Sequence, residues 1–101
     1  YPQVDGIIAS NDIVAISIYK ILHKKNITVP DRIQLIGFDG IDLSELMSPE
    51  LTTVCQPIED MAKTALDVVV RKKENFAKGT EYILPVTLAI RETTKRRGRE
   101  Q

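Results

Sequence analysis

The sequence predicts an α/β fold built on a parallel sheet, and three observations lead to this class. A short apolar run, Ile33–Phe38, ends at Asp39–Gly40 without clean alternation of polar residues, as in a strand buried on both faces. A second apolar run, Gly6–Ala9, precedes it. A helical pattern at Asp12–Lys25 lies between the two, and the order strand, helix, strand predicts a right-handed parallel crossover.

Length and composition limit the chain to one small domain of ordinary globular character. It has 101 residues, 43% of them hydrophobic and 28% charged. The 14 basic and 14 acidic side chains cancel, so the overall charge indicates no nucleic acid or other anionic partner. No apolar run approaches the roughly 18 residues that span a bilayer, and the sequence shows no signal-peptide pattern. The single Cys55 excludes an internal disulfide and fits a reducing compartment.

The first helix is predicted to bury one broad face. Its start is signalled by Ser10–Asn11–Asp12. At about 100° per residue, the core face comprises Val14, Ala15, Ile18, Tyr19, Ile21 and Leu22. Ile13 and Ile16 fall on the polar side beside Lys20. They indicate either a contact patch or the scattered apolar residues that are normal on a surface.

A short helix and a short strand are expected next. Asp42 is placed to cap a helix over Leu43–Met47. Leu51–Val54 favours a strand, and Pro57 then opens a second long helix at its first position.

The second long helix is predicted over Ile58–Glu74, as an amphipathic helix lying on a sheet. Gly79 marks a loop after it, and Tyr82–Arg91 is a final extended stretch that Pro85 breaks or confines to an edge. The apolar stripe of this helix comprises Ile58, Met61, Ala62, Ala65, Leu66, Val68, Val69 and Val70.

Two long helices are too few to cover both faces of a sheet of three or four strands. Small domains already bury only a modest share of their surface. We therefore expect the chain to be a piece of a larger sheet protein, which either folds poorly alone or exposes an apolar seam.

Polar side chains follow the predicted strands at their carboxyl ends, where open α/β sheets bind ligands. Asp39 is a candidate to accept hydrogen bonds from two vicinal sugar hydroxyls or from a protonated nitrogen; alternatively, it forms a turn. Asn11 and Asp12 follow the earlier strand and could hold a polyol; Asn11 could also cap the helix, worth about 1 kcal/mol. Gln56 is a candidate cleft residue, or it satisfies amides at a helix start.

The sequence shows no catalytic or metal-binding constellation. It lacks the dinucleotide, phosphate-loop and nucleophile-elbow motifs, and one His and one Cys cannot form a zinc site. The acidic pair Glu59–Asp60 lies on the polar stripe, and the basic tail Lys95–Arg99 is short. We expect no enzyme, no cofactor and no metal.

Several segments recur in one ordered pattern. They are Ile8–Ala15, Val29–Asp31, Ile36–Asp39, Ser48–Pro57, Leu84–Pro85 and Arg91–Thr94. From about Asp5 to Thr94, this pattern resembles the C-terminal portion of the lactose-repressor/galactose-repressor (LacI/GalR) family of bacterial transcription regulators. Each segment alone would be a weak indication of the family. The resemblance depends on their occurring together in this order and at these spacings.

The resemblance implies a partial two-lobed core similar to type I periplasmic sugar-binding proteins, with parallel sheets flanked by helices. Residues 1–55 and about 87–94 would belong to the C-terminal lobe, about 57–85 to the N-terminal lobe, and 95–101 to a tail. A sugar effector would bind between the lobes of a cytoplasmic homodimer. Operator DNA would be bound through an N-terminal domain that this chain lacks, and no membrane is involved.

The resemblance also implies roles for individual residues. Asn11 and Asp39 match positions that hydrogen-bond the effector, and Gln56 matches one that lines the cleft. Gly40 departs from the family, in which many members carry a second acid there. The implied dimer contacts are Ile13, Ile16, Lys20, Glu45, Leu46 and Met47.

The main hypothesis is thus the effector-sensing and dimerisation core of a repressor, in which the sugar shifts the dimer between states of different DNA affinity. The alternative is a periplasmic or extracellular sugar-binding protein of a transport system with the same core. Ser48–Thr53 favours the repressor, and residues upstream would decide. An enzyme has the least support.

Overall fold

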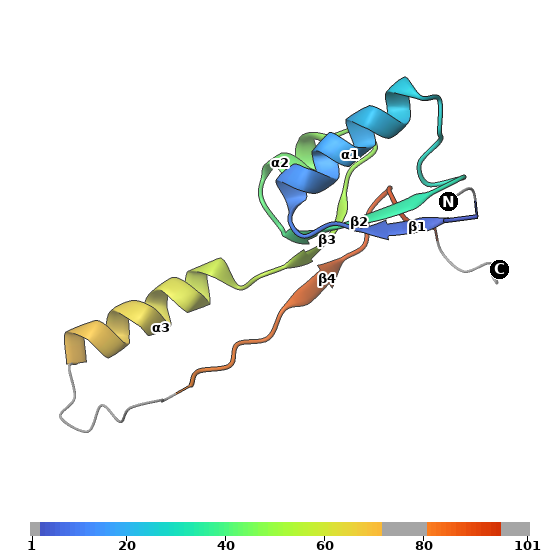
Figure 1. Cartoon of the computed structure of the whole chain (residues 1–101). Helices are drawn as coiled ribbons and strands as arrows, with labels where there is room; N and C mark the ends of the chain where they lie inside the picture. Colours follow the sequence, from blue (N-terminus) through green and yellow to red (C-terminus); the bar gives the residue numbers. More distant parts are fainter. Residues whose placement is uncertain (1–2, 72–80, 96–101) are drawn as a thin grey trace.

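The computed structural model describes residues 3–71 and 81–95 (Figure 1). The predicted loop at Gly79, the end of the second long helix beyond Arg71 and the tail after Lys95 lie outside these residues. The predicted α/β class is confirmed. The elements are β1 Gly6–Ile8, α1 Asp12–Lys24, β2 Gln34–Asp39, α2 Leu43–Leu46, β3 Thr52–Cys55, α3 Ile58–Arg71 and β4 Thr87–Ala89.

The strands form one sheet in the order β1-β2-β3-β4, with β1, β2 and β3 parallel and β4 antiparallel to β3. Ile8 pairs with Ile36, and Asp39 pairs with Cys55. The helix α1 joins β1 to β2 as the predicted crossover. Because the first three strands run the same way, their carboxyl ends meet at one edge of the sheet.

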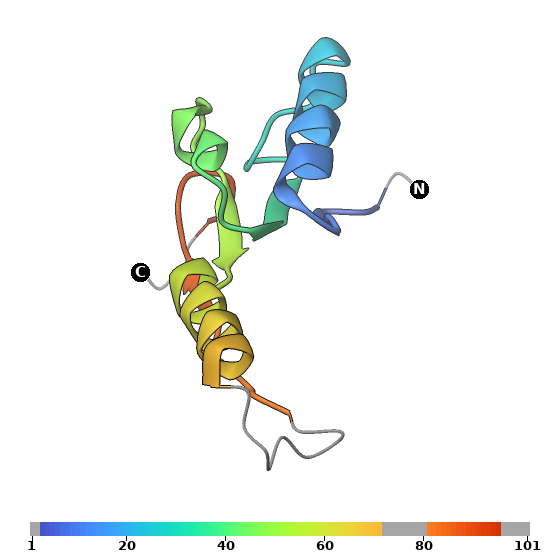
Figure 2. The ribbon, with the colours of Figure 1, turned by 90° about the vertical axis from the view of Figure 1, so that its left-hand side faces the viewer.

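The core lies between the sheet and the two helices α1 and α2, which lie on the same side of it (Figures 1 and 2). Its buried centre is formed by Ala9, Ala15, Leu35 and Leu51. Around this centre pack the partly buried side chains of Ile7, Ile18, Tyr19, Val29 and Met47.

The opposite face of the sheet has no helix on it among the described residues. Ile8 is 79% exposed, and Phe38 and Leu88 are also exposed on that face. The prediction that the second strand is buried on both faces is therefore wrong for this chain, since its helices cover one face only. The predicted apolar seam is confirmed.

The core face of α1 is narrower than predicted. Val14 and Ile21 are exposed, whereas Ala15 and Leu22 are buried. A sheet of short strands contacts only a strip of the helix, so residues at the margins of the predicted face reach solvent. The helix ends at Lys24, and Asn26, the predicted terminator, follows shortly after it with a φ of 61° in the left-handed region.

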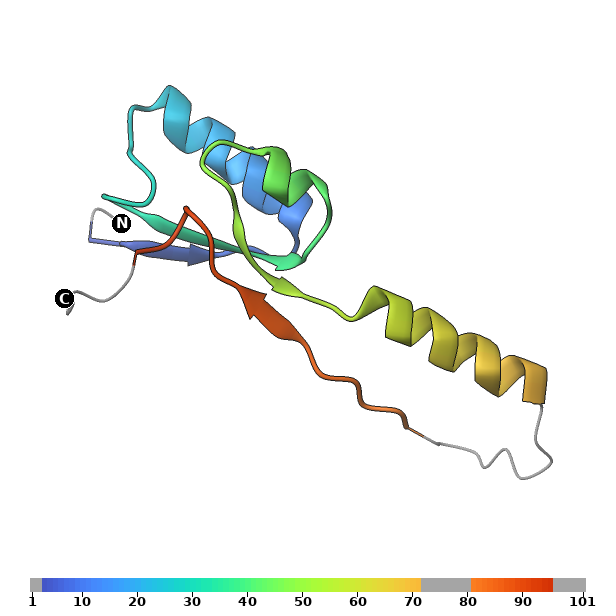
Figure 3. The same cartoon turned by 180° about the vertical axis from the view of Figure 1, so that it is seen from behind.

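The helix α3 projects away from the sheet and gives the molecule extents of 58 × 30 × 26 Å (Figures 1 and 3). The prediction that it lies on a sheet is wrong within the described residues. Its exposed apolar side chains include Ile58, Met61, Leu66, Val69 and Val70.

Two smaller expectations concern the ends of elements. Only Thr87–Ala89 of the predicted strand Tyr82–Arg91 pairs with β3, and this β4 lies at the edge of the sheet. The edge position predicted from Pro85 is confirmed, but the strand is shorter than predicted and begins after Pro85. Asp42 stands at the start of α2, but its side chain makes no cap hydrogen bond there, so the predicted capping role is wrong.

Truncating the core tests this arrangement. Leu51 is fully buried, so Leu51→Ala in the intact protein should lower the free energy of unfolding by about 2–5 kcal/mol. Chemical denaturation measures the loss. The volume-conserving variant Leu51→Met should cost less than about 1.5 kcal/mol, and equal losses for the two variants would contradict the assigned core.

Candidate functional site

Asp39 and Gln56 form a hydrogen-bonded pair at the carboxyl edge of the sheet. Asp39 is the last residue of β2, and Gln56 directly follows β3. The Gln56 Nε2 donates to Asp39 Oδ1 at 2.8 Å, and the Gln56 backbone N–H donates to the Asp39 carbonyl oxygen at 3.1 Å. Both residues are half-buried. The structure thus joins two of the three predicted ligand-binding residues.

The backbone at Asp39 is unusual. Its φ of 125° lies in a region that L-residues rarely adopt, and Gly40 follows with a φ of 79°. A Cβ at Gly40 would lie 2.6 Å from the Cys55 Sγ and 2.9 Å from the Cys55 Cα. The chain therefore turns immediately after Asp39 over a surface that leaves no room for a side chain at residue 40.

Asn11, the third predicted ligand-binding residue, caps α1. Its Oδ1 accepts a hydrogen bond from the Val14 backbone N–H at 2.8 Å. The capping alternative is therefore confirmed, and the effector-binding role of Asn11 stays a prediction. Asn11 lies at the same edge of the sheet as Asp39, and its neighbour Asp12 links the two regions.

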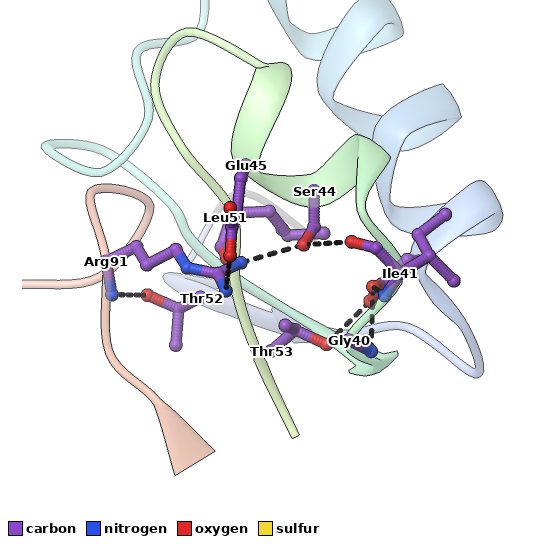
Figure 4. A network of polar contacts seen from close by, with 9 residues as sticks. Gly40, Ile41, Ser44, Glu45, Leu51, Thr52, Thr53 and Arg91 are labelled. Atoms are coloured by element: carbon purple, nitrogen blue, oxygen red, sulfur yellow. Dashed lines mark hydrogen bonds and ion pairs between the residues drawn. The ribbon is translucent and has the colours of Figure 1, made fainter. Parts of the chain in front are cut away.

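Asp12 occupies the junction of α1, β2 and β3 and is fully buried. Its Oδ2 accepts from the Gly40 and Ile41 backbone N–H groups at 3.0 and 2.9 Å, and its Oδ1 accepts from the Thr53 Oγ1 at 2.6 Å. The Gly40, Ile41 and Thr53 groups converge in Figure 4. The expectation that Asp12 holds a polyol is wrong, because a side chain without exposed surface cannot contact a ligand.

Sequence reasoning missed this structural role, although a signal was present. Thr52 and Thr53 stand in a short buried strand, and buried hydroxyls need partners. Asp12, an acidic residue at the start of α1, was a possible partner, but nothing in the spacing specified that it pairs with Thr53, 41 residues away.

Arg91 fixes α2 to the segment that follows β4 (Figure 4). Its Nη1 donates to the Ser44 Oγ at 2.7 Å and to the Leu51 carbonyl oxygen at 2.9 Å. Its Nη2 reaches the Glu45 Oε2 at 3.2 Å, and its backbone N–H donates to the Thr52 Oγ1 at 2.8 Å. No feature of the sequence pointed to this network.

The predicted dimer contacts lie on α1 and on the α2 segment, on the same side of the sheet (Figure 2). Leu46 is 77% exposed and Ile13 is 57% exposed. Lys20 and Glu45 are exposed, while Ile16 and Met47 are half-buried. Met47 also packs against the core. The dimer contacts stay a prediction. The exposed side chains among these residues are accessible to a second copy of the chain.

Other site types receive little support from the described part of the chain. A hollow of about 320 Å³ lies at the far end of α1, away from the Asp39–Gln56 pair. In residues 3–71 and 81–95, no three His, Cys, Asp or Glu side chains gather as a metal ion would require. The helices of these ranges are too short or too polar to cross a bilayer. The hollow is lined by Tyr19, His23, Asn26, Ile27, Thr28 and Val29.

Comparison with known sequences gives a consistent result. Residues 1–94 match the model of the periplasmic binding protein-like domain. The chain is 41% identical over 96 residues to the ribose operon repressor of Halalkalibacterium halodurans, covering 94% of this chain and 29% of that protein. It is 43% identical over 84 residues to the sucrose operon repressor of Streptococcus mutans, covering 83% and 26%. The chain therefore spans less than a third of these relatives.

Solved structures are similar over most of the chain. A LacI family transcriptional regulator from Enterococcus faecalis with bound ribose superposes with a TM-score of 0.79 at 34% identity, covering 89% of this chain and 34% of that one. A periplasmic binding protein/LacI transcriptional regulator from Alkaliphilus metalliredigens, complexed with D-xylulofuranose, gives 0.80 at 38% identity, covering 90% and 35%. Both agree with the family that the sequence pattern resembles.

The cap at the start of α1 can be tested by itself. Asn11→Ala should lower the free energy of unfolding by about 1 kcal/mol, because the Val14 N–H loses its acceptor. Asn11→Ser retains a capping oxygen and should stay within about 0.5 kcal/mol of the wild type. Denaturant titration of the intact protein compares the two, and an unaffected Ala variant would contradict the cap.

Proposed function

Since this chain belongs to the LacI/GalR family, as a segment of its periplasmic-binding-protein-like effector core, we propose that it helps to sense a sugar and to form the dimer of a transcriptional repressor. The observation that carries the proposal is the Asp39–Gln56 pair at the carboxyl edge of the parallel sheet. Open α/β sheets bind their ligands at this edge. The repressor names of the relatives support this function over a transport receptor.

The chemistry of the pair suits a neutral, hydroxyl-rich ligand. A carboxylate offers about four lone-pair sites, so Asp39 can accept from sugar hydroxyls while it stays bonded to Gln56. The chain has no net charge, which gives no general attraction to an anionic sugar phosphate. We infer a pentose or another neutral sugar, in keeping with the ribose and D-xylulofuranose bound to two similar proteins.

The proposed mechanism is linkage between sugar binding and lobe arrangement. We assign residues 1–55 and about 87–94 to one lobe and about 57–85 to the other. The chain leaves the sheet after Gln56 and returns before β4, and α3 lies beyond the sheet, which supports this division (Figure 3). Gln56 would then contact the sugar at the point where the chain crosses between lobes. A sugar that prefers one lobe arrangement shifts the population of the dimer toward it.

The proposed partners follow from the same assignment. The exposed surface of α1 and α2 would meet its counterpart in a second copy, and operator DNA would be bound by another part of the protein. Repressors act in the cytoplasm, and we infer that location here. The relatives are named as repressors, a class that does not depend on catalysis, so we infer no enzymatic role.

Removing the Asp39 carboxylate should weaken sugar binding. Hydrogen bonds to a charged group are worth about 1.5–3 kcal/mol, so Asp39→Ala in the intact protein should raise the dissociation constant about 10- to 100-fold. Titration calorimetry measures the change, using whichever of D-ribose, D-xylulose and sucrose raises the melting temperature of the wild type.

The matched control for this measurement is Asp31→Asn. Asp31 is an exposed acid that precedes β2, at the opposite end of the strand from Asp39. Its replacement should leave the affinity within about twofold, as expected for a distant, independent site. A near-wild-type affinity of Asp39→Ala would remove Asp39 from the binding site.

A charge on the proposed dimer surface should dissociate the dimer. Leu46 is 77% exposed on α2, and a symmetric interface would present the substitution twice. Leu46→Asp should therefore raise the dimer dissociation constant of the intact protein at least about tenfold, as measured by sedimentation. Thr28→Asp, on an exposed loop after α1, is the control. An unchanged dimer in the Leu46 variant would exclude α2 from the interface.

A further inference from the structure

The side chain of Asp12 lies behind the Asp39–Gln56 pair without forming part of it. It has no exposed surface, so it cannot contact a sugar directly. A buried carboxylate needs compensating hydrogen bonds, and Asp12 receives them from two backbone amides and one hydroxyl. These three donors belong to the turn after β2 and to β3, which are the two elements that carry the pair.

The two amides are those of Gly40 and Ile41, the residues immediately after Asp39. With a φ of 125°, Asp39 adopts a backbone conformation that persists only when surrounding structure maintains it. The Asp12 Oδ2 anchors the turn directly after this residue. The negative charge strengthens both hydrogen bonds, since charge-assisted bonds are about twice as strong as neutral ones.

The hydroxyl is that of Thr53, three residues before Gln56 on β3. Through its two oxygens, Asp12 therefore connects the strand that ends at Asp39 with the strand that leads to Gln56. Gly37 makes this possible, because a Cβ there would collide with the Asp12 carboxylate and would lie 2.9 Å from the Leu51 Cδ2. The carboxylate packs directly over the backbone of β2.

We propose that Asp12 is a positioning residue for the sugar-binding pair. Its carboxylate holds the turn at Gly40–Ile41 and the strand at Thr53, and so fixes the Asp39 backbone and the contact between Asp39 and Gln56. This role rests on the proposed sugar site for its function. The mechanical part, in which Asp12 maintains the pair, is independent of any ligand.

The mechanical part is tested by amide hydrogen exchange of the intact protein without sugar. The reporter is the Gln56 backbone N–H, which donates to the Asp39 carbonyl oxygen and does not touch Asp12. The internal reference is the Leu35 N–H, which donates to the Thr93 carbonyl oxygen in the core. In Asp12→Ala, the Gln56 amide should exchange about tenfold faster relative to the Leu35 amide than in the wild type.

Two further variants separate positioning from general stability. Asp12→Asn keeps the shape and one carbonyl oxygen but loses the charge that strengthens the two amide hydrogen bonds. It should therefore restore only part of the Gln56 protection, and it remains informative if the Ala variant does not fold. Leu51→Ala truncates the core without removing a hydrogen bond of Asp12, so the Gln56 and Leu35 amides should lose protection together. If Gln56 and Leu35 also change in parallel in both Asp12 variants, Asp12 does not position the pair.

The functional part is tested by calorimetry with the sugar among D-ribose, D-xylulose and sucrose that raises the melting temperature of the wild type. Asp12→Asn should weaken the affinity by about threefold or more, and this loss should disappear in the Asp39→Ala background, because residues that act through one another are not additive. A loss that persists at full size in that background would overturn the proposed route through Asp39. If the wild type binds none of D-ribose, D-xylulose and sucrose, or if Asp39→Ala binds the selected sugar normally, the sugar site fails, and hydrogen exchange still decides whether Asp12 holds the pair.

Discussion

A buried carboxylate connects the three elements on which the carboxyl edge of this sheet depends. Asp12 lies at the start of α1 and receives hydrogen bonds from the turn after β2 and from β3. Because unmet hydrogen bonds in a buried site are costly, these elements cannot move apart independently. The position of Asp39 and Gln56 follows from this constraint.

The polar network around Arg91 performs a similar task at the other side of β3. It joins α2 and Leu51, directly before β3, to the residues that follow β4, so segments 40 to 47 residues apart are held together. The two networks are linked at Ser44, whose buried Oγ accepts from Arg91 and donates to the Ile41 carbonyl oxygen at 2.6 Å. In a domain with a small apolar centre, such satisfied polar contacts define the packing as much as the hydrophobic side chains do.

The uncovered apolar surfaces are consistent with the length of the relatives. One face of the sheet and the stripe of α3 expose large hydrophobic side chains, and exposed patches of this kind mark surfaces that are normally covered. The chain spans less than a third of the curated relatives it matches. The apolar strands predict helices on both faces of the sheet. Among the described residues, helices cover one face only.

The local elements could be predicted because their causes are local. Apolar runs, the Asn11 cap and Pro57 sufficed for the strands and both long helices. Periodicity predicted wrongly that Val14 and Ile21 are buried and that α3 lies on the sheet. Burial depends on which neighbouring element is present, and periodicity carries no information about that.

Strand direction and chain order are enough to predict the α/β class, the parallel crossover and the place of Asp39 at the carboxyl edge of the sheet. The folded structure was needed to establish that Gln56 bonds to Asp39 and that Asp12 is internal. These outcomes depend on contacts between segments up to 41 residues apart, and side-chain spacing along the chain does not encode which of several polar groups will meet.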